Sequence, residues 1–448
     1  MAAITDHGPA EPARDETAET AKAPYSAAYT GYITFVLALV FMLAAADRNI
    51  MAVLLHPIQK DLGVSDTAMG IMTGTVFSIV YATVALPLAR IADRGHRRNL
   101  IAAAVAFWSA MTALCGVTVN YLTLLAARIG VAAGEAGYQP SILSMLGDLY
   151  PRRRRGIAVG LVSVGASLGI GLGAYLAGLI NDRYGWRAAF LVLGIPGLVV
   201  GALAFLTVPE PPRGTFDGGA KPDPDHASFW RSVRYLASVP TVPRLLLAKI
   251  MLQLGFQGFL TWVTTFFIRV HDMTAAEAGA LFGASVGIGG VASQLLAGFF
   301  SDLLARPGES WRSYWCTLSL LAGVPFMLMV ILGRTEVAIV GLFAISIVTG
   351  GATTASLTAG LGVVRGSMRG FLTAVLLFCV QIFGMALGPM ILGSVSDALK
   401  ATHGEMAIRY SLLLVPLAWV LAALAFWWTG RTADRDAAIA SGEAAPAR

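Results

Sequence analysis

The stretch GYITFVLALVFMLAAADRNIMAVLL, residues 31–55, decides the fold class, because it is apolar except for a few residues such as Asp47 and Arg48. A helix rises about 1.5 Å per residue, so this stretch can cross the roughly 30 Å hydrocarbon core of a bilayer. We expect eleven further spans, at 67–89, 99–118, 121–147, 156–180, 187–208, 245–269, 277–301, 312–333, 337–363, 370–395 and 408–429. The sequence therefore predicts an all-α membrane protein with twelve transmembrane helices.

The composition excludes several other classes of protein. Hydrophobic residues make up 56% of the 448-residue chain and charged residues 13%, whereas soluble domains are about 25% charged. A soluble enzyme, a disordered chain and a fibrous protein are therefore excluded. The net charge of +6 sits in short clusters between apolar runs, so it does not indicate a nucleic-acid partner. The cysteines Cys115, Cys316 and Cys379 and the six histidines show no metal spacing, so we expect no metal, no cofactor and no catalytic residue.

The basic residues predict the orientation of the chain. Lys and Arg gather in the gaps after even-numbered runs, as in RRRR at 152–155, and are sparse after odd-numbered runs. Cytoplasmic loops carry this excess, so we expect a monomer of the inner (plasma) membrane with both termini in the cytoplasm. The expected parts are a disordered cytoplasmic tail (1–30), a six-helix bundle (31–208), a cytoplasmic linker rich in Pro and Gly (209–244), a second six-helix bundle (245–430) and a cytoplasmic tail (431–448).

The two predicted bundles resemble each other in sequence. ALPLARIADR at 85–94 corresponds to LLAGFFSDLL at 295–304, and RRRRG at 152–156 lies where VRGSMRG does at 364–370. Two parallel repeats of six helices are the architecture of a major-facilitator transporter. We therefore expect two pseudo-symmetric bundles around a central cavity.

Four charged residues inside the apolar runs are the candidate proton-coupling site: Asp47, Arg48, Arg128 and Glu135. Charges at membrane depth are expensive and usually mark a transport pathway. Arg128 and Glu135 are seven residues apart, so they share one helix face. The arginines stay charged, so the two carboxylates titrate, and an arginine that moves between them would link protonation to conformation. The alternative is a permanent ion-pair network that joins two helices.

The same cluster is a candidate substrate site. Protonation of one carboxylate leaves it net positive, so Arg48 or Arg128 could anchor an anionic head group. Further candidates for substrate contact are Glu135, Tyr138, Gln253, Gln257, Trp262 and Gln381. Polar residues in membrane helices also hold helices together, and this alternative stays open for the residues of the second bundle.

The loop after the second run reads DRGHRR at 93–98 and is a candidate gating loop. We expect Asp93 to contact the N-terminus of the run at 370–395, or basic residues of the other bundle, in one gate state. Arg94, Arg97 and Arg98 accompany it. The alternative reading is an ordinary basic cytoplasmic loop, which explains the arginines but not Asp93.

Several motifs together resemble the spinster branch of the major facilitator superfamily, in its bacterial form. They are Asp47-Arg48, LPLARIADRGHRRNLI at 86–101, RIGVAAGEAGYQPS at 128–141, GWRAAF at 185–190, EPPRG at 210–214, FIRVHDMTAAEAG at 267–279 and GPMILGSVSDAL at 388–399. The resemblance implies proton-coupled movement of a lysophospholipid or sphingolipid-like amphiphile by alternating access. We expect lipid and proton to move in opposite directions, and cotransport is the open alternative. It places Asp47, Arg128 and Glu135 at the family's coupling positions. Ala89 and His96 depart from the general loop motif, which has glycine at both positions.

A second family leaves an alternative function open. The organic anion:cation symporters are similar around Arg128, Glu135, Ala136 and Pro140. This resemblance implies proton-coupled symport of sugar acids or carboxylates. A membrane sensor or scaffold without transport activity is a third class, but it gives the buried charges no use.

Overall fold

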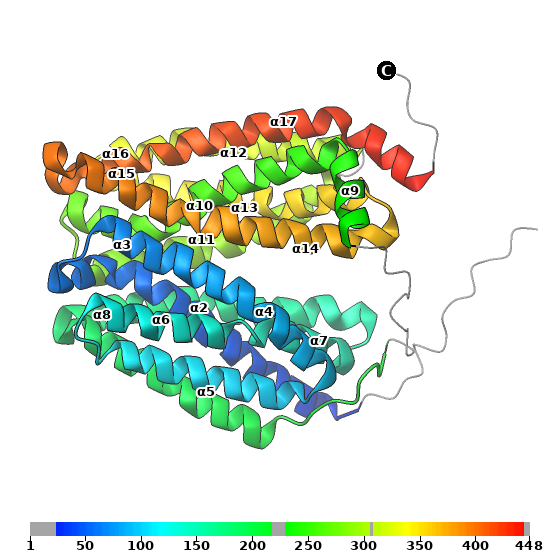
Figure 1. Ribbon diagram of the computed structural model, residues 1–448, viewed down its shortest axis with the longest axis horizontal. Coiled ribbons are helices and arrows are strands. Elements are labelled where there is room, and N and C mark those ends of the chain that lie inside the picture. Colours follow the sequence, from blue (N-terminus) through cyan, green and yellow to red (C-terminus); the bar gives the residue numbers. More distant parts are fainter. Residues whose placement is uncertain (1–23, 217–228, 305–307, 443–448) are drawn as a thin grey trace, which may run out of the picture.

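The chain folds into two helical bundles that lie side by side, with most helices running roughly along the long axis of the molecule (Figure 1). The computed structural model describes residues 24–216, 229–304 and 308–442, and within these ranges it contains helices and no strand. The first bundle is the lower layer in Figure 1 and the second bundle is the upper layer. The predicted all-α membrane fold is confirmed.

The first bundle consists of five helical runs that provide six membrane crossings. They are α2 (Ala27–Leu62); α3 (Asp66–Gly70), η1 (Ile71–Val76) and α4 (Phe77–Arg94) in succession; α5 (Arg97–Cys115); α6 (Tyr121–Glu135) with α7 (Tyr138–Leu149); and α8 (Arg152–Thr207), which contains two crossings. Inside α8, Gly185 has φ 82° and ψ 164°. Glycine adopts this conformation at little cost, so it permits the reversal between the fifth and sixth crossings.

The second bundle follows α9 (Phe229–Ser238), a short helix that runs across the end of the bundle in Figure 1. Its crossings are α10 (Thr241–His271); α11 (Ala275–Leu304); α12 (Glu309–Leu332); α13 (Thr335–Gly362); η2 (Gly366–Met368), α14 (Arg369–Cys379), η3 (Val380–Met385) and α15 (Leu387–His403) in succession; and η4 (Gly404–Met406), α16 (Ala407–Leu412) and α17 (Leu414–Ser441). By length and hydropathy alone, seven helical runs in the described residues could cross a membrane, and the runs of 55 and 76 residues each contain two crossings. The seven runs therefore supply nine crossings, and α6 with α7, α11 and α13 supply the other three.

The helices end at two opposite faces of the molecule. The terminal face contains the start of α2 and the end of α17, and the far face is the opposite end. The expected tail at 1–30 is already helical from Ala27, and its residues 1–23 lie outside the described residues. The expected linker at 209–244 contains α9 and the start of α10, while 217–228 lie outside the description. In the expected tail at 431–448, α17 continues to Ser441, and 443–448 are not described.

Glycines let the helix backbones approach closely. A Cβ on Gly165 would lie 2.5 Å from the carbonyl oxygen of Ala38, and one on Gly169 would lie closer still to that of Met42. This stripe therefore packs α8 against α2 inside the first bundle. The two bundles contact each other through α8 against α11, through α3 against α15 and through α2 against α10.

Candidate transport site

The structure brings the four charged side chains of the predicted cluster together between α2 and α6. Glu135 Oε2 accepts a hydrogen bond from Arg48 Nε at 2.9 Å, and Arg48 Nη2 lies 2.8 Å from the same oxygen. Arg128 Nη1 lies 3.5 Å from Asp47 Oδ1. The two ion pairs are crossed: each helix supplies one arginine and one carboxylate. They join the first crossing to the fourth.

Three of these four side chains are buried, and Arg48 is the one that reaches outward. The exposed fraction is 0% for the side chain of Glu135, 7% for Asp47 and 4% for Arg128, but 31% for Arg48. A buried charge persists only with partners, so the pairs account for the burial. Arg48 is therefore the charged group of the cluster that a solute can reach most easily.

Aromatic rings from α4 form another wall of the cluster. The ring of Phe77 lies 5.6 Å from Arg48 Cζ and 5.4 Å from Arg128 Cζ, and the ring of Tyr81 lies 5.1 Å from Arg48 Cζ. A guanidinium group over an aromatic face is stabilised electrostatically. Phe77 thus contacts both cations, and α4 lines the charged cluster.

The hydrogen bonding of the cluster is incomplete. Asp47 Oδ2 accepts a hydrogen bond from Thr112 Oγ1 of α5 at 2.7 Å. Glu135 Oε1 and Asp47 Oδ1 are buried and accept no hydrogen bond from the residues that the structure describes. Native proteins rarely leave buried oxygens without a donor, and a water, a proton or a ligand commonly supplies one. Both carboxylates therefore keep an oxygen that is available to a proton.

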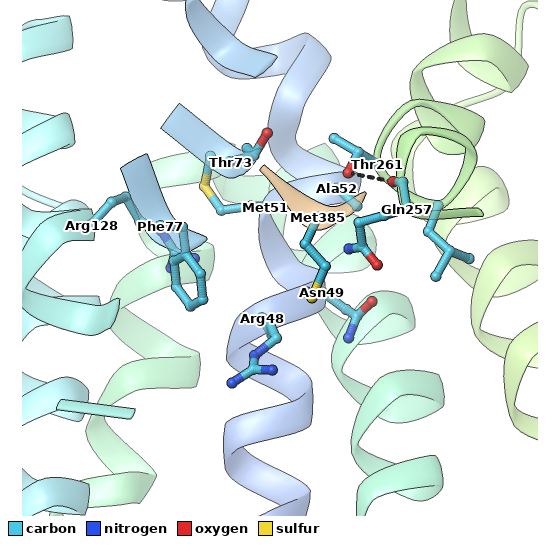
Figure 2. Close-up of a pocket in the computed structure, with 11 residues that line it drawn as sticks. Arg48, Asn49, Met51, Ala52, Thr73, Phe77, Arg128, Gln257, Thr261 and Met385 are labelled. Carbon is cyan, nitrogen blue, oxygen red and sulfur yellow. Dashed lines mark hydrogen bonds between the residues drawn. The ribbon is translucent and has the colours of Figure 1, made fainter. Parts of the chain in front are cut away.

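A cavity of about 40 Å³ lies between the bundles next to this cluster. Figure 2 shows Arg48 and Asn49 on α2, with Phe77 and Arg128 on one side and Gln257 on the other. The lining residues are Arg48, Asn49, Met51, Ala52, Thr73, Phe77, Arg128, Gln257, Leu260, Thr261 and Met385. In this conformation the cavity has room for a water molecule but not for a lipid.

Two π-helical turns border the cavity from opposite bundles. Thr73 lies on η1 and Met385 on η3. The turns touch, because Thr75 Oγ1 donates a hydrogen bond to the carbonyl oxygen of Ala386 at 2.8 Å. Such turns interrupt a regular helix and often occur at functional sites. The second and eleventh crossings are therefore both π-helical where they meet beside the charged cluster.

The other predicted substrate residues have different locations. Gln257 lines the cavity, but Gln253, Gln381, Tyr138 and Trp262 are not among its lining residues. Trp262 is fully buried and donates its indole N–H to the carbonyl oxygen of Pro389 at 3.0 Å.

Two of the remaining three, Tyr138 and Gln253, have packing neighbours of their own. Tyr138 packs against the rings of Phe41 and Trp108. Gln253 packs against Gly384, and Gln381 lies on η3. For Trp262 and Tyr138, the packing alternative describes this conformation.

Sequence reasoning missed several polar residues of the site. Asn49, Thr73 and Thr261 line the cavity, and Thr112 binds Asp47. Each is an uncharged polar residue inside a largely apolar run, which is the signal that could have identified it. Single threonines are common in membrane helices, however, so the signal does not separate these positions from others.

The predicted gating loop binds its own bundle. Arg97 is buried and contacts Asp148 Oδ2 at 2.5 Å and Glu210 Oε1 at 2.7 Å. The backbone N–H of Arg98 donates to Glu210 Oε2 at 2.9 Å. The EPPRG segment therefore fastens this loop to the first bundle.

The expected contact of Asp93 with the 370–395 run is absent from the described residues. The side chains of Asp93 and Arg94 are exposed, and α4 contacts η3 of the second bundle. We expect the Asp93 contact in one gate state only, so it stays a prediction for another conformation.

A second ionic network closes the far face. Arg269 of α10 binds both carboxylate oxygens of Asp66, with Nη1 2.9 Å from Oδ2 and Nη2 3.0 Å from Oδ1. Gln59 Nε2 and Ser396 Oγ also donate to this carboxylate, at 2.5 Å and 2.6 Å. Asp397 of α15 accepts the backbone N–H groups of Asp66 and Thr67 at 3.0 Å and 2.7 Å. We call this network, made of Gln59, Asp66, Arg269, Ser396 and Asp397, the far-face latch.

A related contact joins α8 and α11. Asp182, near the end of the fifth crossing, accepts the backbone N–H of Ala276 at 2.9 Å. Gly178, four residues before Asp182, lies against the backbone of Ala275 at the start of α11. Gly393, four residues before Asp397, lies in the same way against the backbone of Asp66 at the start of α3. The motif Gly-x-x-x-Asp thus holds a helix N-terminus of the other bundle in both halves, where a carboxylate is electrostatically favoured.

Comparison with known proteins assigns the fold to a family. The model of the Major Facilitator Superfamily matches residues 37–389. The chain belongs to the major facilitator superfamily. It is 29% identical over 409 residues to an MFS-type efflux pump of Mycolicibacterium smegmatis, with 90% of this chain and 92% of the relative covered. It is 26% identical over 421 residues to the sphingosine-1-phosphate transporter SPNS2 of Danio rerio, with 88% and 82% covered.

A solved structure agrees with this assignment. The crystal structure of a bacterial homologue of the human lysosomal transporter spinster, in an inward-facing and unoccupied conformation, has a TM-score of 0.81 and 25% identity. The match covers 94% of this chain and 100% of that chain. The resemblance to the spinster branch is confirmed, and the protein is a spinster-like transporter that crosses the membrane several times.

Proposed function

We propose that this transporter moves an anionic amphiphile, a lysophospholipid or a sphingolipid-like molecule, by proton-coupled alternating access. The observation that carries the proposal is the position of Arg48, which lines the cavity between the bundles while its partner Glu135 is fully buried behind it. A guanidinium group binds phosphate oxygens through two parallel hydrogen bonds. A phosphate head group in the cavity would therefore compete with Glu135 for Arg48.

The lining of the cavity suits a molecule with a polar head and an apolar chain. Arg48, Asn49 and Gln257 offer polar groups, and beside them Met51 and Met385 offer flexible apolar surface. Methionine side chains adapt to chains of different shape. The size of about 40 Å³ means that the bundles must separate before a lipid enters.

Two buried carboxylate oxygens that accept no hydrogen bond from the described residues, Glu135 Oε1 and Asp47 Oδ1, support proton coupling. The four charges cancel in the paired state, so a proton on Glu135 leaves one positive charge in excess. That charge attracts an anionic head group, which favours proton and anion bound together. Movement in opposite directions instead requires that the protein bind the proton and the anion in different halves of the transport cycle. The direction of the pH gradient that drives uptake distinguishes the two.

We further propose that the terminal face is cytoplasmic and that the membrane is the inner membrane. Arg97, Arg98 and the basic cluster at 152–155 lie at this face, as the distribution of positive charge on cytoplasmic loops requires. With the far-face latch closed, the conformation described here would then be closed towards the exterior.

The test is uptake of a labelled lysophospholipid into proteoliposomes, with and without an imposed pH gradient. We expect gradient-driven flux in the wild type and a loss of at least about tenfold in Glu135→Gln, because the variant cannot exchange a proton at this position. Glu336→Gln, at an exposed position in the first turn of α13, is the matched control and should keep the wild-type flux.

Two results would contradict the proposal. Wild-type pH dependence in Glu135→Gln would make this carboxylate structural. Absence of lipid flux in a folded protein that transports sugar acids or dicarboxylates would replace the amphiphile by a small organic anion.

A further inference from the structure

A histidine outside the central cluster contacts the far-face latch through Arg269. His56, on α2, is half-buried, and its Nδ1 accepts a hydrogen bond from Arg269 Nε at 3.1 Å. Arginine stays protonated and only donates, so His56 Nδ1 must carry no proton for this hydrogen bond to exist. The closed latch therefore selects the His56 form that carries its proton on Nε2.

The same Arg269 nitrogen also forms an ion pair. Glu405, in η4, places Oε2 3.0 Å from Arg269 Nε, and its side chain is 58% exposed. A proton on His56 Nδ1 would turn this atom from an acceptor into a donor that faces the N–H of Arg269. Protonated His56 would then bind Glu405, and Arg269 Nε would lose both its hydrogen-bond acceptor and its ion-pair partner.

The surroundings of His56 can accommodate its charge. The ring borders a polar hollow of about 700 Å³ that is also lined by Gln59, Arg269, Asp397 and Glu405, so the ring lies beside a space large enough for water. The charged groups around it are Lys60 on its own helix, Asp66 on α3, Arg269 on α10, Asp272 after α10, Asp397 and Lys400 on α15, and Glu405 on η4. These groups carry one negative charge in excess, but Arg269 lies directly against the ring, so a positive imidazole is disfavoured while this contact persists and is tolerated once it is released.

We propose that His56 is a second proton-binding site of the transporter, whose occupancy opens the far face. Arg269 holds α3 and α10 together through Asp66, so a change that weakens its contacts weakens the junction of the two bundles. A conformation without these contacts binds the proton more tightly, and by linkage the proton then favours that conformation. Acid on the far side would therefore open the far face. The inference extends the proposed proton coupling but does not require Asp47 or Glu135 to titrate.

The experiment measures the distance across the far face by pulsed electron paramagnetic resonance. Spin labels are attached at Val119 and Glu336, which are exposed near the far-face ends of α5 and α13, after replacement of the native cysteines. In a background with Asp47→Asn and Glu135→Gln, the remaining response to pH excludes the central carboxylates. We expect the ratio of open to closed molecules to rise about tenfold from about pH 8 to about pH 5, the range in which histidine titrates.

His56→Asn keeps a side-chain acceptor at all pH values, so we expect the far face to stay closed and the response to disappear. His403→Asn is the matched control, because His403 is an exposed far-face histidine that contacts Thr402; it should keep the full response. Glu405→Gln retains His56 but removes the negative acceptor, so the response should move to lower pH. A response that persists in His56→Asn, or that does not move in Glu405→Gln, overturns the proposal. Lipid flux in the otherwise wild-type protein, compared with Glu135→Gln alone, tests the proposed function separately.

Discussion

The central cluster and the far-face latch are both built from arginine and aspartate or glutamate, but they differ in how completely their atoms are paired. In the latch, each oxygen of Asp66 accepts two hydrogen bonds, from Gln59, Arg269 and Ser396. In the cluster, Glu135 Oε1 and Asp47 Oδ1 accept none from the described residues. A fully paired network fixes one arrangement, whereas an incompletely paired one can gain a proton or a ligand. The comparison separates a carboxylate whose oxygens are all paired, Asp66, from two that can still accept a proton directly, Asp47 and Glu135.

The largest effect is expected from breaking the latch. Arg269→Met leaves the buried carboxylate of Asp66 with hydrogen bonds but without an opposite charge. Removal of one partner of a buried ion pair costs about 3–5 kcal/mol. We expect the closed state to lose stability by this amount, with a lower midpoint of thermal unfolding and a longer spin-label distance across the far face.

Arg334→Met is the control for this substitution, because Arg334 is an exposed arginine at the N-terminus of α13. Its replacement should change the unfolding free energy by less than about 0.5 kcal/mol. If Arg269→Met matches this control in stability and in distance, the latch does not hold the bundles together.

An intermediate effect is expected inside the central cluster. Thr112→Val preserves the shape of the side chain but removes the hydrogen-bond donor of Asp47 Oδ2, which is 2.7 Å away. A buried acceptor without a donor costs about 1–3 kcal/mol. We expect this loss in thermal unfolding, while Thr112→Ser, which keeps the hydroxyl, should remain close to wild type. Equal stability of the Val and Ser variants would mean that a water molecule, and not Thr112, donates the hydrogen bond to Asp47 Oδ2.

The two regions also differ in how far the sequence leads to them. Asp47, Arg128 and Glu135 are charges inside apolar runs, so the cost of burial alone marked them before the structure was known. Asp66 and Arg269 lie at the ends of such runs, where a charge is ordinary. They form one network only because α3, α10 and α15 pack together in the folded protein, and no local sequence pattern indicates this contact.

The fold followed from the length and spacing of the apolar runs, but the orientation of individual side chains did not. A membrane helix is apolar on all sides, so its periodicity does not reveal which face borders the cavity. Trp262 and Gln257 are five residues apart on α10, and only Gln257 lines the cavity. The turns η1 and η3 and the continuation of α17 to Ser441 likewise depend on contacts between distant segments.

The smallest effect is expected where the sequence suggested substrate contact and the structure has packing. Trp262→Phe removes the hydrogen bond to the carbonyl oxygen of Pro389, and such a bond contributes about 1 kcal/mol. We expect thermal unfolding to register this loss and the KM for transport to stay unchanged, because the indole lies between α10 and α15. Gln257→Ala should do the reverse, since Gln257 lines the cavity: a several-fold higher KM with wild-type stability. If Trp262→Phe raises KM and leaves stability unchanged, the ring enters the substrate path when the bundles separate, and the boundary of the transport site must then include α10 as far as this residue.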